Sequence, residues 1–163
     1  MKRSQVYKIL ASIEKYPTFL RNTAKNFIIG RAVPFVNTAG LKFEKTDDNE
    51  WIASIANRPS VRNHLRQLHA CAMVLLAESI AILIVAKSLP ADKLPLVKNI
   101  NADFVKRSTG ALRGRVTLTE KQIDYIQNSD KGEIPLEVEI IDEAGIEPVK
   151  IIVTAVWIPK KGT

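Results

Sequence analysis

An α+β fold in which an antiparallel sheet wraps around one long helix is the fold class that this sequence predicts. An apolar segment of 18 residues, 69–86, is long enough to form the helix. Segments in which hydrophobic and polar residues alternate lie before and after it, as strands with one buried face require. The chain has 163 residues, of which 46% are hydrophobic and 25% charged, so it has the composition of one folded domain.

The first part of the chain is predicted to be helical. Four apolar residues recur at the spacing of one helix face: Val6, Ile9, Leu10 and Ile13. Pro17 interrupts this pattern, and a second helical piece is expected over about 18–29. We therefore assign residues 1–32 to an N-terminal helical arm and residues 33–163 to the main domain.

The positive charge of the chain lies mostly in this arm. The formal net charge is +7, with +6 over residues 1–31 and +1 over the rest. A basic amphipathic helix of this kind either packs on the body of the protein or makes weak contact with a membrane surface, and both remain open. Nucleic-acid binding is not expected, because aromatic residues are not interleaved with the basic ones and no known binding motif is present.

A hairpin is predicted next, after a transition marked by Pro34 and Gly40. Hydrophobic and polar residues alternate over 41–45, which favours a strand. A turn of two Asp and one Asn follows, and the chain returns as a second strand over 51–56.

The apolar segment 69–86 is interrupted past His69 only by Glu78 and Ser79. A membrane span needs about 20 apolar residues, and a carboxylate at its centre costs about 3 kcal/mol. A helix that its own sheet buries on every side explains this composition better.

Three or four antiparallel strands are predicted downstream. Residues 99–106 lead through a Ser-Thr-Gly turn to 112–119, and 136–141 lead through Asp-Glu-Ala-Gly to 149–158. A short helix is expected over 120–128.

Glu78 is the leading candidate for chemistry. A carboxylate inside an apolar helix must be paired, protonated or open to a cavity, because ionising it there is unfavourable. It is either a structural glutamate with a partner, or a general base or nucleophile whose pKa burial raises toward neutrality.

The segment 63–71 is the second candidate. The backbone N–H groups at the start of a buried helix can stabilise negative charge that develops on a carbonyl oxygen. Two alternatives remain, since Asn63 could tie the loop and His69 could be a hydrogen-bonded core histidine.

The spacing of His69 and Glu78 constrains how they can cooperate. Nine residues of helix separate them by about 13.5 Å along the axis, and at about 100° per residue they project from opposite faces. If both belong to one site, the helix start comes from one subunit and Glu78 from another, which predicts a homodimer.

At this point the sequence resembles a known family. NHLRQLHACA at 63–72, followed by LAE at 76–78, resembles the signature of hot-dog fold thioesterases, close to the phenylacetate-degradation type and to a poorly characterised thioesterase-like branch. Asn63, His69 and Glu78 occupy the polar positions of that signature. FVKRSTGAL at 104–112 resembles the strand, turn and strand that follow the helix in the family. The resemblance covers roughly residues 33–158.

The resemblance implies a hot-dog domain, homodimers that pair two sheets, with tetramers as the alternative, and acyl-CoA or acyl-carrier thioester substrates. Glu78 would activate water or attack the thioester carbonyl, while Asn63 and His69 would position water or substrate. No metal or redox cofactor is implied, and CoA enters only as part of the substrate. The single cysteine and two histidines also leave few metal ligands. A cytoplasmic protein is expected, because no secretory signal pattern is evident.

Two departures from the family pattern affect the helix start. By the resemblance, the N–H of Ala70 or Cys71 would polarise the carbonyl, and we expect Arg66 and Arg107 to contact the substrate as well. Arg66 stands where the family has Gly, and Ala70-Cys71 replaces Gly-Gly. Side chains there could crowd the thioester, so the alternative function is a non-catalytic acyl-CoA or lipid-binding hot-dog protein.

Overall fold

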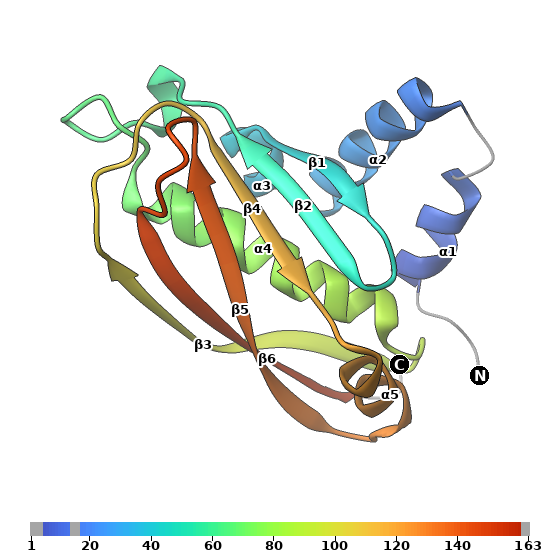
Figure 1. Ribbon diagram of the computed structural model, residues 1–163. Helices are drawn as coiled ribbons and strands as arrows, with labels where there is room; N and C mark the ends of the chain where they lie inside the picture. The colour runs from blue at the N-terminus through green and yellow to red at the C-terminus, as the bar shows by residue number, and fades with distance from the viewer. Residues whose placement is uncertain (1–4, 14–16, 161–163) are drawn as a thin grey trace.

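The centre of the molecule is helix α4 (Ala70–Ser88), around which a six-stranded sheet curves (Figure 1). The computed structural model describes residues 5–13 and 17–160. The strands lie in the order β1-β2-β4-β5-β6-β3, and every neighbouring pair is antiparallel. Their bounds are Leu41–Thr46 (β1), Glu50–Ile55 (β2), Lys93–Phe104 (β3), Leu112–Thr117 (β4), Gly132–Asp142 (β5) and Val149–Pro159 (β6). This is the predicted sheet around a helix.

Close packing of α4 on the sheet explains its composition. A Cβ on Gly114 of β4 would lie 3.1 Å from Leu76 and 3.2 Å from Ile80, so the glycine lets helix and strand approach. By length and hydropathy α4 could also cross a membrane, but 61% of it is buried inside the molecule. The sheet therefore accounts for the apolar residues of α4, as expected of a core helix.

One face of α4 is not fully covered, which corrects the expectation that the helix is buried on every side. Cys71 is exposed, and Leu75, Glu78 and Ile82 are only partly buried. Their spacing places these four residues along one stripe of the helix. The sheet curves around one side of α4, and this stripe, Cys71–Leu75–Glu78–Ile82, lies on a side where the cover is incomplete.

Two strands begin earlier than predicted, and one pairing is not local. β3 begins at Lys93 instead of 99, and β5 at Gly132 instead of 136. β3 is an edge strand that pairs with β6, whereas β4 lies between β2 and β5. The strands predicted as consecutive across the Ser-Thr-Gly turn are therefore not neighbours in the sheet.

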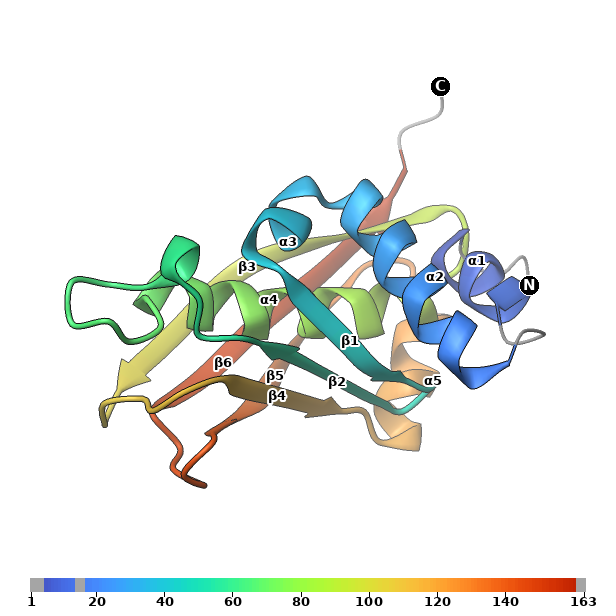
Figure 2. The same cartoon turned by 90° about the horizontal axis from the view of Figure 1, so that it is seen from above.

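The N-terminal helices pack on the body of the protein. Helix α1 (Gln5–Ile13) contacts α4, and Ile13 is buried. The side chains of Val6, Ile9 and Leu10, which were expected on the same face, lie outside the described residues. Helix α2 (Thr18–Ala32) contacts β1, at the end of the molecule away from the loop before α4 (Figure 2). The burial of Ile13 favours packing over membrane contact for this face of α1.

Side chains cover the outer edge of β1. The Asn26 amide accepts from Phe43 N–H (2.7 Å) and donates to the Phe43 carbonyl (3.3 Å), as a neighbouring strand would. Lys25 donates to the Glu44 carbonyl at 3.2 Å, and Lys87 of α4 donates to the Thr46 carbonyl at 2.7 Å. The backbone of Phe43, Glu44 and Thr46 on this edge is thus hydrogen-bonded by side chains of the same chain.

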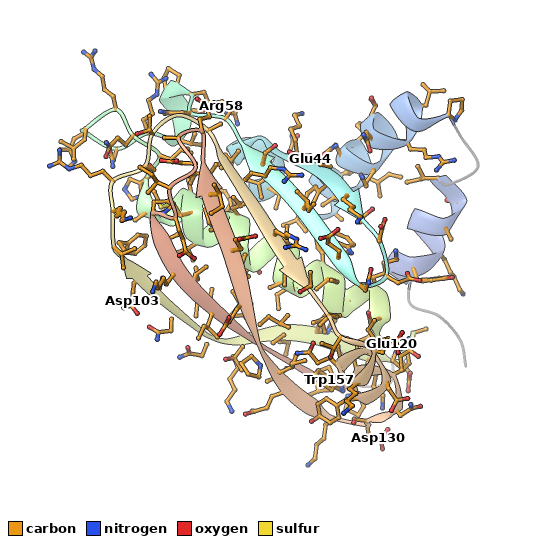
Figure 3. The ribbon with its side chains drawn as sticks, viewed as in Figure 1. Glu44, Arg58, Asp103, Glu120, Asp130 and Trp157 are labelled. Atoms are coloured by element: carbon orange, nitrogen blue, oxygen red, sulfur yellow. The ribbon has the colours of Figure 1, made fainter. Side chains whose placement is uncertain are left out.

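Two short helices complete the fold. Helix α3 (Pro34–Ala39) joins α2 to β1 and was not predicted. Helix α5 (Glu120–Asn128) was predicted at these bounds and begins with a Thr119–Gln122 capping box. It covers Trp157, whose ring meets Tyr125 edge to face at 5.3 Å (Figure 3).

Candidate functional site

The loop before α4 is a closed, hydrogen-bonded turn. Asn63 N–H donates to the Gln67 carbonyl at 2.8 Å, and the Asn63 side-chain oxygen accepts from the N–H groups of Leu65 (2.9 Å) and Gln67 (3.1 Å). The polar oxygen of Asn63 is therefore used to shape the loop. This arrangement supports the loop-tying interpretation of Asn63 over direct contact with substrate.

Arg66 has the backbone conformation that explains a glycine in the family pattern. Its φ is +61°, and it is the one non-glycine residue with positive φ among residues 5–13 and 17–160. The left-handed region favours glycine because a Cβ is crowded there. Arg66 thus has a backbone conformation in which glycine is favoured, and its side chain is exposed.

His69 caps the start of α4 with its imidazole. Its Nδ1 accepts from Cys71 N–H at 3.1 Å, which requires an unprotonated Nδ1. Its backbone N–H donates to the Val61 carbonyl at 2.9 Å and holds the helix start against the turn at Pro59–Val61. Among the described residues no acceptor is found for Ala70 N–H. Of the two amides predicted to polarise a carbonyl, that of Ala70 is therefore available, and that of Cys71 is engaged.

Glu78 is a partly buried carboxylate that has no cationic partner among the described residues. No Lys, Arg or His nitrogen of the described chain lies within ion-pair distance of it. Burial raises the pKa of the Glu78 carboxyl above its ordinary value, and a hydrogen bond from the Ser79 hydroxyl (3.4 Å) opposes this rise. The Glu78 carboxyl therefore holds its proton more tightly than an exposed glutamate does.

Within one chain the predicted catalytic residues are not all brought together. Asn63 and His69 flank the helix start, whereas Glu78 lies nine residues further along the unbroken helix α4. That spacing corresponds to about 13.5 Å along the axis. Cys71 and Glu78, in contrast, share one face of α4 because they are two turns apart.

The two arginines expected to contact substrate lie in different loops at one end of the molecule. Arg66 is in the loop before α4, and Arg107 is in the loop between β3 and β4 (Figures 1 and 2). Both side chains are exposed. The structure therefore places two positive charges in loops at the end of the molecule where α4 starts, and among the described residues neither guanidinium has a hydrogen-bond partner.

A groove beside the helix start was missed by sequence reasoning. It encloses about 210 Å³ between α3, the turn at Pro59–Val61 and the first turns of α4. Phe35, Thr38 and Leu75 line it together with His69 and Cys71. The available signal was Pro34 followed by Gly40, since a helix often starts with proline and ends at glycine. Both were instead interpreted as breaks.

No metal site is formed by the part of the chain that the structure describes. Within residues 5–13 and 17–160, no three His, Cys, Asp or Glu side chains gather closely enough to hold a metal ion. At the α4 start the structure places backbone amides, the His69 imidazole and the Cys71 thiol, and the Glu78 carboxylate lies further along the same helix.

Comparison with known proteins points to one family. Residues 22–158 match a family described as a domain of unknown function, DUF4442. No curated protein matches the sequence.

Several solved structures share the fold. A probable thioesterase of unknown function from Pseudomonas aeruginosa is 21% identical, with a TM-score of 0.75 over 88% of this chain and 97% of that chain. A thioesterase from Haemophilus influenzae is 18% identical, with a TM-score of 0.68 over 85% and 90%. A variant of a thioesterase from Staphylococcus aureus is 14% identical, with a TM-score of 0.67 over 78% and 100%. These likenesses confirm the hot-dog fold that the resemblance predicted.

Proposed function

The chain belongs to the DUF4442 family, a thioesterase-like family with the hot-dog fold, and on that premise we propose that it hydrolyses acyl-CoA or acyl-carrier thioesters. The single observation that carries this proposal is Glu78, an unpaired carboxylate on the central helix whose burial raises its pKa. An ionised carboxylate without a cationic partner is unfavourable at a partly buried place, so its occurrence on this apolar helix supports a role in chemistry.

The proposed reaction uses Glu78 and the α4 start on one thioester. The Ala70 N–H donates to the carbonyl oxygen, so that negative charge developing on it is stabilised. Glu78 takes a proton from water as the water oxygen bonds to the carbonyl carbon. The carbon–sulfur bond then breaks, the thiolate leaves and receives the proton, and the products are a carboxylic acid and a free thiol.

Glu78 acts alternatively as a nucleophile, which would join its carboxylate to the acyl group as an anhydride. Single turnover in oxygen-18 water separates the two routes. Direct attack by water leaves the Glu78 carboxylate unlabelled, whereas hydrolysis of an anhydride at its Glu78 carbonyl introduces the label into Glu78.

A shared site between two copies follows from the length of α4. His69 and Glu78 are too far apart along one helix to act on the same carbon, so Glu78 of one copy would face the α4 start of the other. Two features support a homodimer. The Cys71–Leu75–Glu78–Ile82 stripe is incompletely covered, and edge strand β3 exposes Leu94, Leu96, Val97 and Phe104.

Arg66 and Arg107 are proposed to attract the phosphates of CoA. Both are exposed at the end of the molecule where the helix start lies. Positive charge near a site raises the local concentration of an anionic substrate, and the effect falls as salt is added.

The test is hydrolysis of a panel of acyl-CoA substrates by the wild type and by Glu78→Gln. We expect Glu78→Gln to lower kcat/KM about 10²–10⁴-fold, the range for loss of a general base, while the protein stays folded. The matched control is Glu137→Gln, an exposed carboxylate on β5, which should retain full activity. An inert wild type, or a fully active Glu78→Gln, would overturn the proposal.

A non-catalytic acyl-binding protein is the second candidate, and the His69 cap favours it. With Cys71 N–H already bonded to the imidazole, one fewer amide is available for a developing oxyanion. Saturable binding of acyl-CoA without turnover would select this alternative.

A further inference from the structure

We propose that the groove between α3 and the start of α4 holds the acyl chain of the substrate and selects chains of medium length, about six to eight carbons. This inference rests on the proposed function, since it names the substrate class of the same site. It concerns a surface built by α3, which lies outside the motif that carries the family resemblance.

The lining of the groove suits a hydrocarbon chain. Phe35, Val61, Ala72 and Leu75 supply apolar surface, and Phe35 is 62% exposed at the rim. His69 and Cys71 also line the groove, and they flank Ala70, whose N–H would hold the thioester carbonyl. Each methylene buried on such a surface strengthens binding, because apolar area is removed from water.

Hydrogen bonds within the single chain hold the walls of the groove together. The Arg58 guanidinium (labelled in Figure 3) donates to the Thr38 carbonyl at 2.6 Å, which ties the end of α3 to the turn at Pro59–Val61. His69 N–H donates to the Val61 carbonyl at 2.9 Å and ties that turn to α4. A preformed groove of this kind avoids part of the ordering cost of binding.

The volume of the groove indicates the length of the acyl chain that it can hold. An apolar cavity of about 150 Å³ holds one molecule of benzene, which has six carbons. By that comparison, the groove volume of about 210 Å³ corresponds to about eight chain carbons.

A larger hollow on the outer face of the sheet does not suit the same ligand. It encloses about 690 Å³, but carboxylates line it, among them Asp103 (Figure 3), Glu137 and Glu147. Burying a hydrocarbon chain there would desolvate these charges without pairing them.

The kinetic test compares octanoyl-CoA with acetyl-CoA. Phe35→Ala removes the rim of the groove and should lower the octanoyl-to-acetyl ratio of kcat/KM about tenfold, as should Ser60→Phe, which fills the groove from an exposed position. The matched control is Phe27→Ala on α2, where the phenylalanine is 69% exposed but outside the groove, and where the ratio should stay that of the wild type. Unchanged ratios in both groove variants would overturn the inference.

A second test measures binding of a ligand in the groove and does not depend on catalysis. Cys71, the single cysteine of the chain, lies exposed in the groove and can be alkylated with iodoacetamide. A non-hydrolysable octyl thioether of CoA should slow alkylation of the wild type about tenfold, whereas CoA alone should not. Phe35→Ala should need a higher concentration of the thioether for the same protection.

The two tests separate failure of the inference from failure of the proposed function. Protection of Cys71 by the octyl thioether in a protein that hydrolyses no thioester would leave the groove assignment standing and overturn the hydrolase. Hydrolysis without such protection, or equal protection by CoA alone, would overturn the groove assignment and leave the hydrolase standing.

Discussion

Glu78 makes the stability of the molecule depend on pH in a defined direction. Because burial raises the pKa of its carboxyl, the folded state holds the proton more tightly than the unfolded state. The stabilisation is present at low pH and is lost as the pH rises through the folded-state pKa. Glutamine resembles the protonated acid, so Glu78→Gln should raise the free energy of unfolding at pH 7.5 and change it little near pH 4.

This prediction is measured by denaturant unfolding at both pH values and at one protein concentration. Glu137→Gln, on an exposed carboxylate, should show no such pH-dependent gain. An equal effect of Glu78→Gln at pH 4 and pH 7.5 would contradict the assignment of a raised pKa.

Arg66 carries backbone strain that glycine would relieve. A side chain in the left-handed region costs about 1–2 kcal/mol, so Arg66→Gly should be about 1 kcal/mol more stable than Arg66→Ala. Both variants lose the same guanidinium, so their difference reports the backbone alone. At His64, in the same loop, the order should reverse because its φ is not positive. Thermal or denaturant unfolding of the Gly and Ala variants at both positions measures these differences in stability.

These two residues show why the site was only partly predictable. Glu78 could be recognised from the sequence because an acidic residue is conspicuous in an apolar segment. The conformation of Arg66 could not, because its side chain gives no sign of a positive φ. The engagement of Cys71 N–H by His69 depends on a rotamer, which residue spacing does not determine.

At the scale of elements, α2 acts as a cover for the edge of β1. The Asn26 amide makes two hydrogen bonds to the backbone of Phe43, and replacing it leaves a partly buried N–H without an acceptor. Asn26→Ala should therefore lower the free energy of unfolding by about 1–3 kcal/mol. Asn22→Ala is the control, because Asn22 contributes only its backbone carbonyl to Asn26. A loss no greater for Asn26→Ala than for Asn22→Ala would contradict this role.

The elements that the sequence predicted are those with a strong local pattern. α4 could be placed because its segment is apolar over most of its length, and α5, which was predicted at the observed bounds, begins with a local Thr119–Gln122 capping box. The first part of β3 was missed because it is an exposed edge with Pro95 inside it, so burial does not alternate along it. Its pairing with β6 joins segments that are distant in the chain, and no turn between them marks it.

At the scale of the whole molecule, the proposed site exists only when two copies meet. Leu96 is 42% exposed on β3, and Leu96→Asp should raise the dissociation constant of the homodimer at least about tenfold. Phe27→Asp, on α2, should leave it unchanged. Light scattering coupled to size exclusion measures the mass, and activity should fall in parallel with dimer content. A monomeric wild type with full activity would contradict a shared site.

The cover that α2 and α4 provide for β1 has a consequence for assembly. A sheet with two unpaired edge strands can pair with another copy at each edge, which gives an open-ended assembly. Here β1 is already hydrogen-bonded within its own chain, so β3 is the edge at which another copy can add. Two β3 edges that meet about a two-fold axis leave none for a third copy. In the proposed homodimer, the hydrogen bonds that Asn26 and Lys25 make to β1 would thus keep a third copy from adding to the sheet.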